Sequence, residues 1–160
     1  MADIIHVTMQ NLKDFQDWLL SLRERNWAEN IYLDLPLDVV LNHAPKNLSQ
    51  AAQETLAYIV AGDRGNRDLD RDVNFMLDNA DKFPHLLGRA FSYSGSRRTG
   101  YIYGIIMDTI RKRPIDQNIA AIYAMLQYDR IHSSKLGTGM VSKTSRETAQ
   151  MLNEIFIEAM

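Results

Sequence analysis

The sequence predicts a mainly α-helical fold, a single irregular bundle of about six or seven helices with one or two short extended segments. Apolar residues recur at intervals of three and four along most of the chain, the spacing that places them on one face of a helix. The chain has 160 residues, and one compact domain with one core is typical of that length. No fixed-period repeat is visible, which argues against a solenoid.

The N-terminal part of the chain is expected to contain a helix over residues 11–25. Asn11 precedes its apolar stripe and belongs to the residue types that cap helix N-termini. Two short segments on either side, residues 3–8 and 31–35, are candidates for extended structure. The apolar stripe of the helix consists of Leu12, Phe15, Trp18, Leu19 and Leu22.

Two further helices are expected before residue 63. A short helix over residues 37–44 ends at Pro45, which cannot continue it. A longer helix is opened by Asn47 or Ser49 and ends at the stop signal of Gly62.

A charged turn leads into the next predicted helix. Asp68 is expected to cap that helix, which stops before Pro84, where a further short helix begins. Arg67, Arg71 and Asp72 have opposite-sign neighbours at helical spacing, so we expect solvated ion pairs at this helix start.

Two more helical patterns precede the C-terminal part. The segment 99–107 has apolar residues at helical spacing but is rich in β-branched isoleucine, which leaves both helix and strand open there. Pro114 then begins the most regular amphipathic stripe of the chain. Its members are Ile115, Ile119, Ile122 and Leu126.

The whole chain, residues 1–160, is interpreted as one helical domain that ends in a flexible connector, residues 133–143, and an amphipathic helix, residues 144–160. Thr144 and Glu147 form a capping box at the start of that helix. A helix tethered in this way can pack on its own domain, exchange into a second copy to form a homodimer, or dock on a partner. The residues proposed for such an interaction are Met151, Leu152, Ile155, Phe156 and Met160.

Composition and charge indicate a folded cytoplasmic protein. The chain contains no cysteine, which suits a reducing compartment and excludes thiolate metal sites and cysteine nucleophiles. The N-terminus lacks the pattern of a signal peptide, and no apolar run reaches the length of a membrane span. No cofactor or metal ion is expected.

A basic segment on an otherwise acidic chain suggests one alternative function. Between residues 88 and 113 there are six basic residues and one acidic residue, interleaved with tyrosines. Such a mixture can hold phosphates by charge and nucleobases by stacking, so this segment is a candidate site for nucleic acid or another polyanion. The candidate residues are Arg89, Arg97, Arg98, Tyr101, Arg111, Lys112 and Arg113.

A second alternative is nucleotide binding at residues 137–144. Gly137, Lys143 and Thr144 have the spacing of a phosphate-binding loop, but Ser142 replaces its second glycine. No apolar strand leads into the segment, and a buried strand is part of a working loop. A connector followed by a helix cap is therefore the favoured interpretation.

No catalytic constellation is visible. The four histidines are far apart in sequence, none has a metal-ligand spacing, and no serine lies in a nucleophile turn. The sequence therefore favours a non-enzymatic protein that binds another protein, for instance as an inhibitor, an immunity-type protein or an adaptor.

Overall fold

The computed structural model describes residues 5–23, 31–62, 67–94 and 101–135, together with Gln150, Asn153, Glu154 and Ile157. Helices dominate the described part and one short sheet accompanies them, so the prediction of a mainly α fold with short extended segments is confirmed. The elements are β1 (Ile5–Val7), α1 (Leu12–Ser21), β2 (Ile31–Leu33), α2 (Leu37–Val40), α3 (Gln50–Gly62), α4 (Leu69–Asp78), α5 (Pro84–Ser94), α6 (Tyr101–Lys112), the 3₁₀ helix η2 (Ile115–Gln117) and α7 (Ile119–Lys135).

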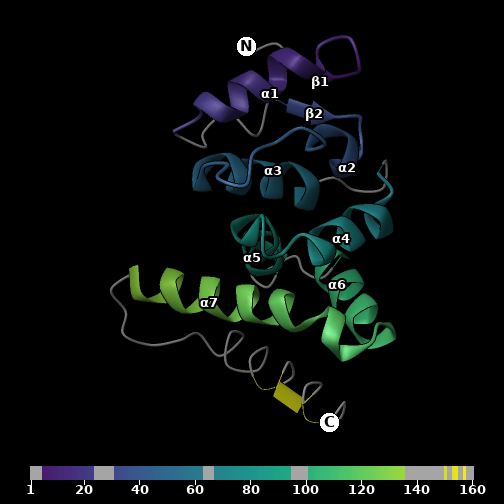
Figure 1. The fold of residues 1–160 in the computed structure, drawn as a ribbon, viewed down its shortest axis with the longest axis vertical. Coiled ribbons are helices and arrows are strands. Elements are labelled where there is room, and N and C mark those ends of the chain that lie inside the picture. The colour runs from purple at the N-terminus through teal and green to yellow at the C-terminus, as the bar shows by residue number, and fades with distance from the viewer. Residues whose placement is uncertain are drawn as a thin grey trace.

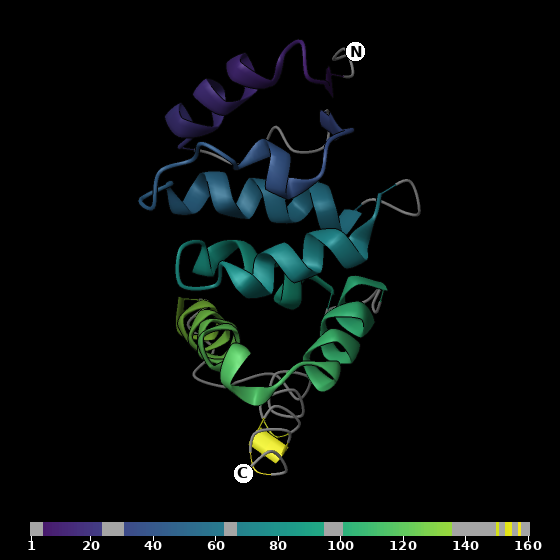
Figure 2. The same cartoon turned by 45° about the vertical axis from the view of Figure 1, so that its right-hand side comes forward.

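Three successive helix pairs are stacked along the long axis of the molecule, as Figures 1 and 2 show. The pairs are α2 with α3, α4 with α5, and α6 with α7. The second helix of each pair lies in one row, in which α3 packs on α5 and α5 on α7. The first helix of each pair lies in another row, in which α2 packs on α4 and α4 on α6. The first helices begin at residues 37, 69 and 101, so each begins 32 residues after the one before. The helix spacing repeats although the residue types do not, so the sequence argument against a solenoid is wrong for the described helices α2 to α7, whose pairs are stacked at a fixed spacing.

The N-terminal end of the stack is closed by α1 and a two-stranded sheet (Figure 1). β1 and β2 pair in parallel, with Ile5 opposite Ile31 and Val7 opposite Leu33. Both strands lie within the segments predicted to be extended, and α1 forms the crossover that parallel neighbours require.

Arg67 lies buried between β2 and α4. Its guanidinium donates hydrogen bonds to the carbonyl oxygens of Leu33 and Leu35, the second at 3.0 Å. Its Nε donates to Oδ2 of Asp72 at 2.9 Å, while Oδ1 of Asp72 accepts the backbone N–H of Leu37 at 3.0 Å. The Arg67 and Asp72 side chains are only 5% and 1% exposed, so the pair ties the end of β2 and the start of α2 to α4.

The expectation of solvated ion pairs at this helix start is therefore wrong for Arg67 and Asp72, and the exposed Arg71 finds its partner Asp38 on α2 instead of at the helix start. Burial raises the pKa of the Asp72 carboxyl, against the opposing effects of the Leu37 N–H and the Arg67 charge. A buried charge is costly unless it is paired and hydrogen-bonded, and the carbonyl oxygens of β2 complete the set of acceptors around Arg67.

Tyr128 of α7 links the second helices of the three pairs, because its side chain passes α5 and reaches α3. The Tyr128 hydroxyl of α7 donates a hydrogen bond to Oε1 of Glu54 on α3 at 2.9 Å, and the tyrosine ring lies against Gly88 of α5 on the way. A Cβ at position 88 would lie 2.7 Å from Cγ of Tyr128 and closer still to its Cβ. Glycine is therefore required at this close approach.

A buried glutamine joins α3 to the start of α5. Oε1 of Gln53 accepts the backbone N–H groups of His85 and Leu86 at 2.9 and 3.1 Å. These donors belong to the first turn of α5, where no carbonyl within the helix is available to them. Pro84 precedes them, as predicted for a first helical position.

The predicted helix starts at Ser49 and Asp68 are confirmed, because the side chain of each accepts the backbone N–H three residues later. Asn11 occupies the predicted N-cap position of α1, but its side chain makes no capping hydrogen bond. Its Oδ1 instead accepts the N–H of Thr8 and its Nδ2 donates to the carbonyl of His6, so Asn11 closes the turn between β1 and α1.

The structure resolves the choice left open for residues 99–107, because Tyr101 begins helix α6. The stripe predicted after Pro114 is only partly correct: Ile122 is buried, whereas Ile119 is exposed. The buried face of α7 runs instead through Ala121, Met125 and Tyr128, so the predicted stripe lies at its margin and Ile119 falls outside it. The predicted connector also begins too early, since α7 continues to Lys135.

Replacing Arg67 by methionine is expected to lower the free energy of unfolding by about 3–5 kcal/mol, because the Asp72 carboxylate is left buried without its partner. Without the guanidinium the folded-state pKa of Asp72 rises further, and stability is then lost as the pH rises through that pKa. The deficit should therefore be larger at about pH 7 than at about pH 5. Urea denaturation at the two pH values measures it.

The matched control is Arg71→Met, which breaks an ion pair whose side chains are 49% and 38% exposed and should cost far less stability than Arg67→Met, because solvent screens exposed charges. Equal losses in the two variants would contradict the role given to Arg67.

Replacing Gly88 by alanine is expected to destabilise the protein by about 1–3 kcal/mol, because the added methyl group displaces the Tyr128 ring. Gly104 of α6 is the control, since a Cβ there meets nothing within 4 Å. Gly104→Ala should be neutral or stabilising by up to about 1 kcal/mol, as expected for a helical glycine in open space. Thermal unfolding of both variants tests the contrast, and a neutral Gly88→Ala would refute it.

Candidate functional site

Helix α1 is held over the segment that joins α2 to α3 by two hydrogen bonds, one near each end of the contact. Nε2 of Gln16 donates to the carbonyl oxygen of Val40 at the end of α2. Oγ of Ser49 donates to the carbonyl oxygen of Leu22 at 3.3 Å, just beyond α1. These ties fix how α1 lies against residues 41–49.

An apolar groove of about 480 Å³ lies along this contact. Its floor includes the buried side chains of Leu19, Leu41 and Leu48. Its rim carries two apolar residues that remain largely in solvent, Met9 at 66% and Leu20 at 48% exposure. The groove is lined by Met9, Leu12, Lys13, Gln16, Asp17, Leu19, Leu20, Leu41, His43, Ala44 and Leu48.

The charged residues of the groove lie at its edge. Lys13 and Asp17, one turn apart on α1, form an ion pair of 3.1 Å with both side chains exposed. His43 lines the opposite wall and is exposed. An apolar floor with a charged edge suits the binding of apolar side chains.

A second group of polar side chains lies across α3, α5 and α7. The Arg89 guanidinium carbon lies 4.4 Å from the centroid of the Tyr58 ring, a cation–π contact. The His85 ring meets the Tyr128 ring edge-on at 6.3 Å, and Tyr128 donates to Glu54. These contacts join neighbouring helices, so helix packing explains why these polar side chains lie together.

No metal site is found in the part of the chain that the structure describes, where no three histidine or acidic side chains come together. Within the same ranges, no helix is both long enough and apolar enough to cross a membrane.

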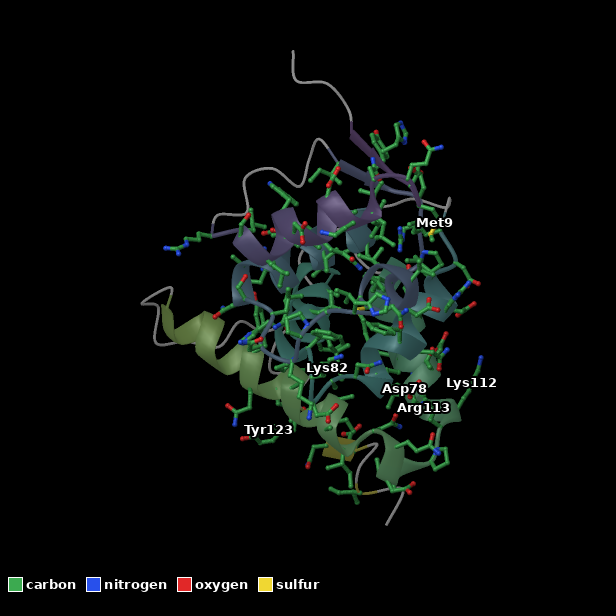
Figure 3. All side chains as sticks on the ribbon, turned by 45° about the horizontal axis from the view of Figure 1, so that its top comes forward. Met9, Asp78, Lys82, Lys112, Arg113 and Tyr123 are labelled. Carbon is green, nitrogen blue, oxygen red and sulfur yellow. The ribbon has the colours of Figure 1, made fainter. Side chains whose placement is uncertain are left out.

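The cations of the predicted polyanion site do not form one free surface. Arg89 is engaged with Tyr58, and Arg113 forms an ion pair with Asp78 of α4. Arg111 and Lys112 are exposed at the C-terminal end of α6, where the helix dipole by itself favours cations. Figure 3 shows Lys112 and Arg113 together with Asp78. Arg97 and Arg98 lie outside the described residues, and of Tyr101 only the backbone is described, so polyanion binding stays a prediction.

The remaining predicted sites lie outside the described residues. These are the nucleotide-binding candidates Gly137, Lys143 and Thr144, and the interaction candidates Met151, Leu152, Ile155, Phe156 and Met160. Their described neighbours Gln150, Asn153, Glu154 and Ile157 are helical, as the prediction of a C-terminal helix requires.

Sequence reasoning missed the groove, because it assigned Leu12, Leu19 and Leu41 to the core and left Met9 and Leu20 unused. The signal was present in the first predicted helix. Leu20 lies beside the apolar stripe without belonging to it, and Met9 precedes the helix altogether. Apolar residues outside the core stripe are the ones that remain for a surface.

Comparison with known proteins adds no relative, since no family model, curated protein or solved structure matches the chain.

Proposed function

We propose that the protein acts by non-catalytic binding to another protein, whose apolar side chains enter the groove between α1 and residues 41–48. The observation that carries the proposal is the exposure of Met9 and Leu20 beside a floor of buried leucines. Covering an exposed leucine or methionine contributes about 1.5–3 kcal/mol per side chain. Two such residues beside one groove give a partner apolar anchors.

The shape of the molecule supports the same proposal. Stacked helix pairs expose long surfaces to partners while their cores stay fixed. The groove lies at the α1 end of the stack, and Figure 3 shows Met9 at that end, away from Tyr123 on α7. An amphipathic helix is a suitable ligand, since its apolar side chains recur at the spacing that a groove of this kind receives.

An inhibitor, an immunity-type protein and an adaptor all act through such a surface and need no cofactor. We place this activity in the cytoplasm because the chain has no cysteine, as suits a reducing compartment.

The test combines a photo-crosslinking residue at position 20 with a charged substitution in the groove. A crosslinker in place of Leu20 should capture a defined protein from native lysate, whereas one in place of Tyr123, which is more exposed but lies on α7, should not. Leu20→Glu should then weaken binding of the captured protein at least about tenfold, which corresponds to 1.4 kcal/mol.

Tyr123→Glu is the matched control, because it places the same charge on another exposed apolar site. Equal loss of binding in both variants, or capture from position 123 alone, would exclude the groove as the binding surface.

A further inference from the structure

The chain carries a segment of its own whose apolar pattern fits the α1 groove. Within residues 144–160, Leu152, Ile155, Phe156 and Ala159 fall on one face of a helix. The described positions agree with a helix, since Nε2 of Gln150 donates to Oε1 of Glu154 one turn later at 3.3 Å. We call residues 144–160 the tail segment.

The lengths of the groove and of the apolar face agree. The groove-lining residues of α1 run from Leu12 to Leu20, which is about 12 Å at 1.5 Å per residue. The apolar face runs from Leu152 to Ala159, about 10 Å on the same measure. One helix of this length can therefore lie along the groove.

Charge does not oppose the encounter of the two surfaces. The tail segment contains three acidic residues and one basic residue. Lys13 and Asp17, which line the groove, neutralise one another in an ion pair. The fit of the two surfaces is therefore apolar.

The placement of the two surfaces points to pairing between molecules. The groove lies at the α1 end of the stack, whereas the helical positions of the tail segment, drawn in yellow, lie beyond α6 and α7 at the other end (Figures 1 and 2). Because the groove and the tail segment lie at opposite ends of one molecule, we expect their pairing to join two copies of the chain.

We propose that the tail segment of one copy docks in the α1 groove of a second copy. The inference rests on the proposed function, because the occupant uses the same groove, and a partner protein must then compete with the tail segment. The contact is heterologous: each copy offers one groove and one tail segment, so association continues head to tail unless a ring closes.

Sedimentation velocity on the full chain and on two complementary variants tests the proposal. Leu20→Glu disables the groove, and Phe156→Glu disables the tail segment. The wild type should grow in mass with concentration above the 18.4 kDa of one chain, while each variant alone should stay at that mass. An equimolar mixture of the two variants should form a dimer of twice that mass and grow no further, because only one intact contact is left.

Tyr123→Glu is the control and should associate as the wild type does. The proposal is overturned if the wild type stays at the mass of one chain throughout, or if mixing the variants restores no dimer. It is also overturned if Phe156→Glu lowers the melting temperature while Leu20→Glu does not, because the tail segment then packs on its own chain.

The failures of the two proposals are distinguishable. A wild type that never associates, but still loses its crosslinked partner on Leu20→Glu, retains the proposed function and excludes self-docking. A wild type that associates through the groove but captures no other protein supports self-docking and removes the proposed partner.

Discussion

The structure depends on one buried arginine. Arg67 reaches from the turn before α4 to the carbonyl oxygens of Leu33 and Leu35, while its partner Asp72 holds the first N–H of α2. Apart from the exposed ion pair of Asp38 with Arg71, β2 and α2 would otherwise be joined to the stack by apolar packing, which is not directional. The groove is built from α1, which crosses between the two strands, and from the segment that follows α2. The Arg67 guanidinium therefore sets the position of the groove relative to the stacked helix pairs.

Polar side chains that bridge elements distant in sequence recur through the rest of the fold. Gln53 of α3 holds the first turn of α5, Tyr128 of α7 reaches Glu54 of α3 across Gly88, and Gln16 of α1 holds the end of α2. Apolar burial supplies most of the stabilisation in such a core, whereas each buried polar group penalises any arrangement that leaves it unpaired. Together these bridges fix the angles of the stack, and so the shape of the groove that α1 presents.

The sequence predicted the helices well where the signal is local. Ser49 and Asp68 open helices as expected, because a cap depends only on residues three positions away. It did not anticipate that the Asn11 side chain bonds to the turn after β1, although its partners His6 and Thr8 are close in sequence. It failed where the partner is distant, because Arg67 is buried against carbonyl groups more than thirty residues earlier in the chain. The groove was missed for the same reason: Met9 and Leu20 become a site only when residues 41–48 lie opposite α1.

Native-state hydrogen exchange on Arg67→Met is the most direct test of the claim that this residue fastens the groove-bearing end to the stack. If it does, the α1 end opens separately in the variant, so the amides of β1, β2, α1 and α2 become less protected than those of α5 and α7, whose loss is limited to the lower free energy of unfolding of the whole chain. Equal protection of both ends in the variant, or no change at the α1 end, would contradict the account.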